Sequence, residues 1–274
     1  MCKVLEVSRS GYYKWKEAQV SPQAARKALL LQRITYHFKD THDRYGSPKI
    51  TILLQREGHQ VSERTVGKYM QELGFRSCVA KQFRVNTTDS NHELPIAPNL
   101  LNQQFATAKP NQTWVTDITY IPCREGRMYL ASVLDLCTRE IVGWRLSDRM
   151  TTDLVLGALD DAYTAKRPGK GLIHHSDRGS QYASADYRKR LVKYRMKASM
   201  SRKGNCYDNA CIESFHSLLK KEFVYCTRFK TKQQAYDEIF QYIEFFYNLK
   251  RIHGSLGYVS PAQFAATFKK KKSV

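Results

Sequence analysis

The chain has 274 residues, 42% of them hydrophobic, and is long enough to bury a sizeable core in one large domain or two unequal ones. Its 45 Lys and Arg residues outnumber 25 Asp and Glu residues, and the net charge of +20 favours a polyanion, nucleic acid first, as the partner. No apolar run approaches the roughly 18 residues of a membrane span, and the N-terminus lacks the apolar stretch of a secretory signal. We therefore expect a cytoplasmic protein without a membrane partner.

The first part of the chain, residues 1–85, carries the start and stop signals of several helices. Ser21-Pro22 and Ser47-Pro48 each place a capping residue before a proline, which is typical of a helix start. Ser62 is the expected cap of a third helix, and a glycine follows each of the last two helical patterns. Together these signals predict a small helical domain.

The last two of these helices and the short turn between them predict a helix-turn-helix. An ordinary helical hairpin with solvated charges explains the same pattern equally well. If the motif binds DNA, its outer basic side chains are the expected contacts: Lys49, Arg56, Arg64 and Lys68.

Residues 86–111 are rich in Asn, Thr and Pro without a sustained period, which predicts a linker or extended arm. A larger domain is expected over 112–268, followed by a basic tail at 269–274. Three strand patterns at 113–121, 127–138 and 140–148 predict an antiparallel meander. Helical and short strand patterns then alternate, so the predicted fold class is α/β, a mixed sheet flanked by helices.

Three acidic residues occupy notable places in this larger domain. Asp117 lies inside the first strand, where apolar or β-branched residues are usual. Asp177 directly follows an apolar strand, at the end where such sheets place their ligand crevices. Glu213 lies on a later helix beside its apolar stripe, and Lys220 follows two turns on. A salt bridge or a cap would explain each acid alone, but three converging carboxylates require cations, and magnesium suits oxygen ligands.

The stripes of this later helix can be assigned by spacing. The apolar stripe is Ile212, Phe215, Leu219 and Phe223. The neighbouring polar stripe is Asn209, Glu213, His216, Ser217 and Lys220. A zinc cluster of Cys206, Cys211 and His216 is an alternative use of this region, but it lacks a fourth ligand and the usual spacing. The seven cysteines, without a CxxC pair, are therefore interpreted as reduced thiols.

The three acids resemble the catalytic residues of DDE transposases and retroviral integrases, which share a ribonuclease-H-like core. Asp117 in WVTDITYI corresponds to the first acid, Asp177 in HSDRGSQY to the second, and Glu213 in NACIESF to the third. The 35 residues at 178–212 between the last two acids match the family's signature spacing. Lys220 matches the basic residue that follows the glutamate by seven positions.

More narrowly, the chain resembles second-reading-frame transposases of bacterial insertion sequences of the IS-three type over nearly its whole length. The motifs that carry this resemblance are VSRSGYYKW near the start, RYGSPKI at 44–50 and YNLKRIHGSLGYVSPAQF at 247–264. The zinc-binding HHCC module of the retroviral relatives has no counterpart in the sequence.

The resemblance implies an enzyme that cleaves and joins DNA strands. Metal-dependent hydrolysis at the 3′ ends of an insertion sequence is followed by transesterification, in which the freed 3′-OH attacks another phosphodiester. Asp117, Asp177 and Glu213 would hold two Mg²⁺ ions, with Mn²⁺ as a substitute, and Lys220 would contact DNA near the reacting end. Ser176 is then no nucleophile. The pair His174 and His175 is expected to be structural or to face DNA.

The resemblance also implies partners. We expect a multimer on DNA that handles both element ends and the target, a fusion or complex with the upstream-frame product, and a cytoplasmic, nucleoid-associated location. Arg178, Arg202 and Lys203 are further expected DNA contacts, and a structural contact is the alternative for Arg178. Two other functions stay open from the residues alone, namely a nuclease that only hydrolyses and a DNA-binding protein without catalysis.

Overall fold

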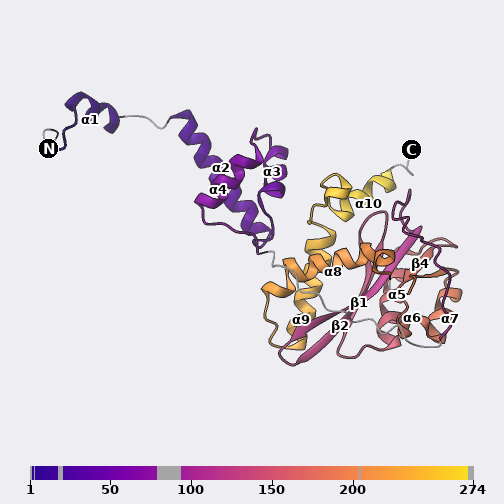
Figure 1. Ribbon diagram of the computed structural model, residues 1–274. Helices are drawn as coiled ribbons and strands as arrows, with labels where there is room; N and C mark the ends of the chain where they lie inside the picture. The colour runs from indigo at the N-terminus through magenta and orange to yellow at the C-terminus, as the bar shows by residue number, and fades with distance from the viewer. Residues whose placement is uncertain (1, 3, 18–20, 79–93, 204, 271–274) are drawn as a thin grey trace. The chain divides into compact units, whose positions relative to one another are not determined.

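The structure, a computed structural model, describes residues 2, 4–17, 21–78, 94–203 and 205–270. The chain divides into two compact units, Met1–Cys78 and Val79–Val274 (Figure 1). Over the described ranges, no helix is both long and apolar enough to cross a membrane.

The first unit is helical, as predicted. Its helices are α1 (Arg9–Lys16), α2 (Pro22–Asp40), α3 (Ser47–Arg56) and α4 (Glu63–Glu72). The side chains of Ser21 and Ser62 cap α2 and α4, accepting hydrogen bonds from the third residue after each cap at 3.1 and 3.3 Å. The predicted cap at Ser47 is wrong by one residue, because Gly46 is the N-cap of α3 and makes no side-chain bond there.

The helices α2, α3 and α4 pack around a small apolar core, which supports the helix-turn-helix-like arrangement. The buried side chains of this core include Ile34, Phe38, Ile50, Leu54, Val66 and Met70. Gly58 and Gly74 follow α3 and α4 with φ values of +89° and +68°. These left-handed conformations favour glycine, so the two residues end their helices as the sequence indicates.

The second unit is built on one five-stranded mixed sheet. Its strands are β1 (Thr113–Cys123), β2 (Gly126–Asp135), β3 (Ile141–Ser147), β4 (Ile173–Ser176) and β5 (Lys197–Met200). They lie in the order β3-β2-β1-β4-β5. The first three strands form the predicted antiparallel meander, and β4 and β5 add in parallel to β1. This topology confirms the predicted ribonuclease-H-like α/β fold.

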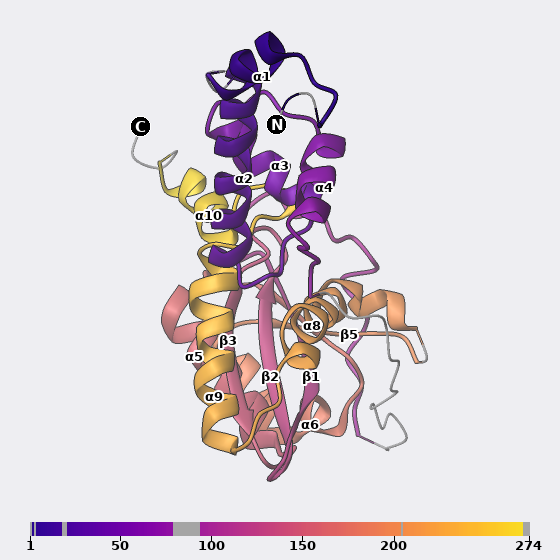
Figure 2. The ribbon, with the colours of Figure 1, turned by 90° about the vertical axis from the view of Figure 1, so that its left-hand side faces the viewer.

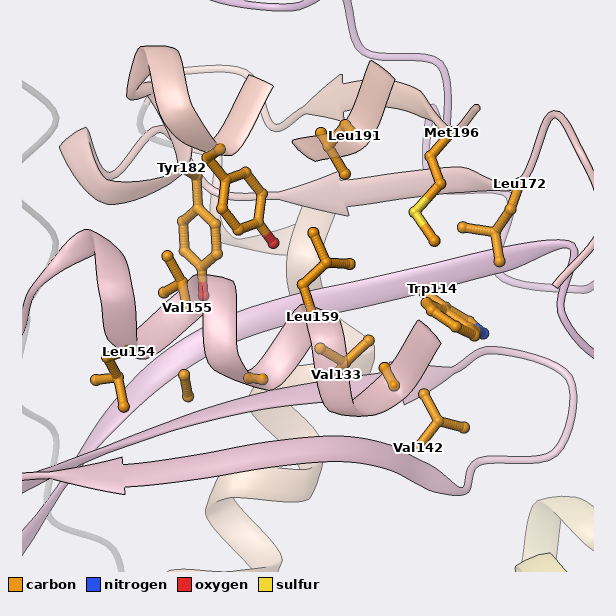
Figure 3. Packing of buried hydrophobic residues seen from close by; sticks show 14 of the residues in the cluster. Trp114, Val133, Val142, Leu154, Val155, Leu159, Leu172, Tyr182, Leu191 and Met196 are labelled. Atoms are coloured by element: carbon orange, nitrogen blue, oxygen red, sulfur yellow. The ribbon is translucent and has the colours of Figure 1, made fainter. Parts of the chain in front are cut away.

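One face of the sheet is covered by α5 (Thr152–Lys166), α6 (Ser180–Ala183) and α7 (Ala185–Lys193). Their apolar side chains and those of the strands form a continuous buried core, in which Trp114 and Tyr182 are among the largest members (Figure 3). Helix α5 approaches β3 closely at Gly143, where an added Cβ would collide with the backbone of Ala158 and Ala162. Only glycine fits at this crossing.

The other face carries the C-terminal part of the chain (Figure 2). Its segments are η1 (Cys206–Asn209), α8 (Ala210–Glu222), η2 (Val224–Cys226), α9 (Lys232–Phe240), η3 (Gln241–Asn248), η4 (Gly254–Leu256) and α10 (Pro261–Lys270). The predicted apolar stripe of α8 is confirmed, since Ile212, Phe215 and Leu219 are all 1% exposed or less. The side-chain amide of Asn248 bonds both the N–H and the C=O of Ile141, which ties η3 to β3.

The segment before β1 belongs to this second unit. Residues 94–112 form no helix or strand, yet Leu101 is buried and the backbone N–H groups of Leu100 and Leu101 donate to Ser199 Oγ in β5. Residues 86–93, the first part of the predicted linker, lie outside the described residues. The predicted boundaries of the linker and of the basic tail stay predictions.

Candidate active site

The register of the sheet brings Asp117 and Asp177 together. Strands β1 and β4 run parallel, and their last registered pair is Val115 with His175. Asp117 and Asp177 each lie two residues beyond this pair, so they are neighbours where β4 ends. This is the carboxyl edge at which such sheets place ligand crevices, as the sequence predicted.

Local hydrogen bonds orient the two aspartates. Asp117 Oδ1 accepts from the backbone N–H of Ile118 at 2.8 Å, and Asp177 Oδ1 accepts from the N–H of Gly179 at 2.9 Å. A Cβ on Gly179 would lie 3.1 Å from Asp177 Oδ1. Since φ at this residue is −60°, the glycine serves this close approach and not a left-handed turn.

Glu213 joins the two aspartates from the first turn of α8. Its side chain is exposed, but partial desolvation by the surrounding protein raises the pKa of its carboxyl group, and the charges of Asp117 and Asp177 raise it further. Within the residues that the structure describes, Glu213 accepts no hydrogen bond that would counter these effects. The charges of Asp117 and Asp177 thus act on Glu213, which lies near both of them.

The donor set of this site suits magnesium. No three His, Cys, Asp or Glu side chains of the described ranges converge tightly enough to enclose an ion by themselves. Magnesium does not require such a cage, since it is commonly held through one or two carboxylates while water and substrate phosphate complete its shell. Hard carboxylate oxygens that repel one another at a strand end provide that kind of open site.

Lys220 lies two turns beyond Glu213 on α8, against the outer part of β1. Its ammonium group is 4.2 Å from the ring centroid of Tyr120, a cation–π contact. Partial burial lowers the pKa of Lys220, and the charge of Asp117 opposes this shift. The predicted basic group is therefore held close to the acids by an aromatic ring that the sequence did not single out.

His216 is a further residue of the site whose contacts sequence reasoning missed. It is 5% exposed, with Nε2 2.7 Å from Ser132 Oγ and Nδ1 3.4 Å from Asp117 Oδ2. The zinc alternative is not supported, because Cys211 Sγ instead accepts a hydrogen bond from Arg139. The side chain of Cys206 lies outside the described residues. In the sequence, only the spacing of three residues between Glu213 and His216 indicated that His216 lies on the same side of the helix as the acid.

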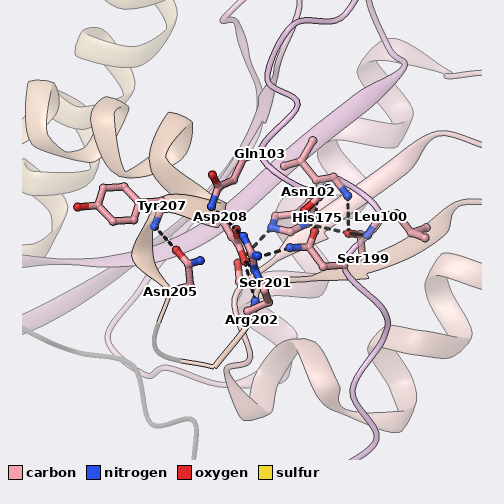
Figure 4. A network of polar contacts seen from close by, with 12 residues as sticks. Leu100, Asn102, Gln103, His175, Ser199, Ser201, Arg202, Asn205, Tyr207 and Asp208 are labelled. Carbon is pink, nitrogen blue, oxygen red and sulfur yellow. Dashed lines mark hydrogen bonds and ion pairs between the residues drawn. The ribbon is translucent and has the colours of Figure 1, made fainter.

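A separate polar network holds the loop that leads into α8 (Figure 4). Its centre is Asp208, whose fully buried carboxylate accepts from Asn99, Gln103 and Arg202 at 2.8–3.0 Å. The hydrogen-bonded guanidinium of Arg202 holds the pKa of Asp208 well below its usual range. The network fastens the segment before β1 to the start of the helix that carries Glu213.

The two histidines before Asp177 are buried in the core. His175 contacts Ser199 Oγ at 2.8 Å and Ser201 Oγ at 3.1 Å, and His174 Nε2 lies 3.3 Å from the hydroxyl of Tyr187. Burial lowers the pKa of His174 to about 3 and that of His175 to about 4. Both rings are thus neutral parts of the core, the structural one of the two predicted roles.

Ser176, the residue between His175 and Asp177, is buried as well. It is 3% exposed, and its hydroxyl donates to the backbone carbonyl of Asp177.

Three predicted DNA contacts of the second unit, other than Lys220, lie near the Asp208 network. Arg178 Nε donates to the backbone carbonyl of Ser201 at 2.7 Å, and Arg202 is paired with Asp208. Lys203 is exposed in the same loop. Arg178 thus has the structural contact considered for it, while DNA binding by all three stays a prediction.

The predicted DNA contacts of the first unit lie on α3 and α4. Arg64 and Lys68 are exposed one turn apart on α4, opposite the buried Val66 and Met70. The ammonium of Lys49 on α3 lies 4.5 Å from the ring centroid of Tyr45. Their binding to DNA also stays a prediction.

The chain is similar to known families, proteins and solved structures over most of its length. An Integrase core domain family matches residues 107–206, a second Integrase core domain family matches 213–267, and an HTH-like domain family matches 25–83. A simian T-cell lymphotropic virus intasome, solved with PP2A regulatory subunit B56 gamma, aligns at a TM-score of 0.49 and 14% identity, covering 85% of this chain and 74% of that one. The HTLV-2 integrase catalytic core domain in complex with magnesium aligns at a TM-score of 0.45 and 15% identity, covering 58% and 99%.

Two curated relatives match nearly end to end. The insertion element IS600 uncharacterized 31 kDa protein of Shigella sonnei is 46% identical over 264 residues, covering 96% of this chain and 97% of its own. The transposase InsF for insertion sequence IS3A of Escherichia coli (strain K12) is 38% identical over 266 residues, covering 96% and 92%. The chain therefore belongs to the IS3-family transposases, polynucleotidyl transferases with an HTH-like domain and an integrase core domain.

Proposed function

We propose that Asp117, Asp177 and Glu213 hold two Mg²⁺ ions for cleavage at the 3′ ends of an insertion sequence and for transfer of the freed 3′-OH into target DNA. Mn²⁺ substitutes for Mg²⁺. The observation that carries the proposal is the register of β1 and β4, which makes the two aspartates neighbours at the strand end. The raised pKa of Glu213, caused in part by both aspartates, supports its place in the same site.

The three carboxylates and Lys220 have different roles in the proposed reaction. Magnesium, when bound, supplies charge that favours in-line displacement at phosphorus. The carboxylates bind and orient it, and the ammonium of Lys220, close to Asp117, pairs with a DNA phosphate near the reacting end. Water and then the freed 3′-OH are the nucleophiles of the proposed reaction, without a covalent protein–DNA link, and the burial of Ser176 is consistent with this.

The proposal extends to the assembly. The HTH-like unit binds DNA through Lys49, Arg64 and Lys68, and the core adds Arg178, Arg202 and Lys203. Two element ends must be handled together, so the working form is a homo-multimer on DNA, with the upstream-frame product as a fusion or partner, at the nucleoid in the cytoplasm. The net charge of +20 supports a polyanionic substrate.

Asp177→Asn tests the proposed catalytic role. With duplex DNA carrying candidate element ends and Mg²⁺, we expect the variant to give no cleaved or joined product while it binds the DNA as the wild type does. Asp186→Asn is a matched control, because the side chain of Asp186 is 73% exposed on α7 and its ion pair with Lys189 is long, at 3.8 Å. Wild-type strand transfer by Asp177→Asn would refute the proposal.

A substrate with a pre-cut 3′-OH separates strand transfer from simple hydrolysis. The proposal predicts joined product from this substrate, in amounts that depend on Mg²⁺. Hydrolysis of uncut DNA without joined product from the pre-cut DNA would instead identify a nuclease.

A further inference from the structure

His216 is linked to two acids of the proposed site, to Glu213 along α8 and to Asp117 by a side-chain contact. It lies on α8 three residues after Glu213, a spacing that puts both side chains on the same side of the helix. Its ring reaches the sheet, where it meets Asp117 on β1 and Ser132 on β2. Asp117 and Ser132 are themselves directly paired across these strands. His216 therefore connects the helix of Glu213 with the strand of Asp117.

The partners of the two ring nitrogens of His216 indicate which nitrogen carries the proton. If Nε2 carried the only proton and donated to Ser132, the lone pair of Nδ1 would face the carboxylate of Asp117 at 3.4 Å, which is unfavourable. The consistent arrangement has the hydroxyl of Ser132 donating to Nε2 at 2.7 Å and a proton on Nδ1 facing Asp117 Oδ2. Asp117 then faces a donor at each oxygen, since Ile118 N–H donates to Oδ1 at 2.8 Å and His216 Nδ1 lies 3.4 Å from Oδ2.

The residue types Ser132, His216 and Asp117 also occur in hydrolytic triads, but that role does not fit this site. Ser132 is 0% exposed and lies in the middle strand of the antiparallel meander, so no substrate reaches its hydroxyl. The three residues are placed to orient a carboxylate and not to activate a nucleophile. Hydrogen-bonded partners of this kind commonly fix the carboxylates that hold metals.

We propose that His216, backed by Ser132, is a positioning residue that orients Asp117 and sets its placement relative to Glu213, so that divalent metal binds. The inference rests on the metal-holding role proposed above for Asp117. Loss of such a partner typically weakens metal binding by about 10–100-fold. His216 itself touches neither metal nor DNA.

Two amides of different length separate positioning from a general packing role. Asn at residue 216 can place a donor where Nδ1 lies, whereas Gln reaches toward Ser132 and removes that donor from Asp117. We expect His216→Asn to bind Mn²⁺ within about threefold of the wild type and His216→Gln to bind it about tenfold or more weakly. His174→Gln controls for loss of a buried histidine, since His174 is 1% exposed and contacts Tyr187 instead of an acid.

The measurement is Mn²⁺ binding to the full chain, by electron paramagnetic resonance without DNA, alongside the Mg²⁺ dependence of cleavage. Weaker binding by His216→Gln, with His216→Asn and His174→Gln close to the wild type, supports the proposal. Equal Mn²⁺ binding by His216→Asn and His216→Gln overturns it. Asp177→Asn is measured in parallel, because unchanged Mn²⁺ binding by that variant would refute the metal site itself and not only the role of His216.

Discussion

Two acidic centres lie close to the start of α8, and they differ in what surrounds their carboxylates. Asp208 is fully buried, yet it accepts hydrogen bonds from two amides and from Arg202, and its pKa is held low. Glu213, five residues later, is exposed and accepts none from the described residues, and partial desolvation and two neighbouring aspartates raise its pKa. A carboxylate that accepts several hydrogen bonds from the protein stabilises the fold, whereas carboxylates that raise one another's pKa are suited to bind cations.

Substitutions at the two centres should differ most in their effect on catalysis. Asp117→Asn should abolish Mg²⁺-dependent strand cleavage, a loss of more than about 10³-fold, because metal coordination provides several kcal/mol of transition-state stabilisation. Asp208→Asn should retain measurable cleavage in its folded fraction. A single-turnover cleavage assay on both variants measures this. Complete loss of cleavage by both variants would contradict the different roles of the two centres.

The next largest effect is on stability, and it concerns Asp208, whose carboxylate accepts several hydrogen bonds. Asp208→Ala leaves the amides of Asn99 and Gln103 and the backbone N–H of Arg202 without their acceptor. The free energy of unfolding should fall by about 2–4 kcal/mol, since each buried group left unpaired costs about 1–3 kcal/mol. Urea unfolding at neutral pH measures this, with Asp186→Ala as an exposed control, and equal midpoints for both variants would contradict the account.

The two centres should also respond oppositely to pH. The lowered pKa of Asp208 contributes stability above the ordinary aspartate range near 4, and this is lost as pH falls through and below that range. The raised pKa of Glu213 works in the other direction, since it destabilises the metal-free fold as pH rises above the ordinary glutamate range. Glu213→Gln should therefore raise the melting temperature of the metal-free protein at pH 7 slightly and remove stabilisation by Mg²⁺. A fall in melting temperature without metal would contradict this.

The smallest expected effect concerns the cation beside the acids. Tyr120→Phe keeps the ring under Lys220, while Tyr120→Leu removes the cation–π contact, worth about 0.5–2 kcal/mol. We expect Tyr120→Leu to weaken binding of element-end DNA by about two- to thirtyfold, with Tyr120→Phe close to the wild type. Fluorescence anisotropy at fixed salt measures both, and equal affinities would show that Tyr120 does not position Lys220.

Local sequence patterns predicted most of the fold. Alternation and turn signals identified the strands of the meander, and the spacing of Ile212, Phe215 and Leu219 identified the buried face of α8. The cap predicted at Ser47 failed because a serine before proline marks a helix start only to within a residue or so. Such patterns are local, and so are the physical preferences that produce them.

The contacts that complete the site could not be predicted in the same way. Ser132 and His216 are 84 residues apart in sequence, and Asn99 and Asp208 are 109 apart. Periodicity assigns a residue to a face but does not say which distant side chain meets it. His216 was therefore placed on the correct helix stripe, while its contact with Asp117 followed only from the fold.

The central claim is that Asp117, Asp177 and Glu213 form a shared metal site. Anomalous diffraction from crystals of the full chain grown or soaked with Mn²⁺ tests it most directly, because it locates the ion independently of activity. The account predicts Mn²⁺ peaks within bonding distance of these three carboxylates and none at Asp208. Mn²⁺ bound at Asp208 or elsewhere, with no peak at the three acids, would contradict it.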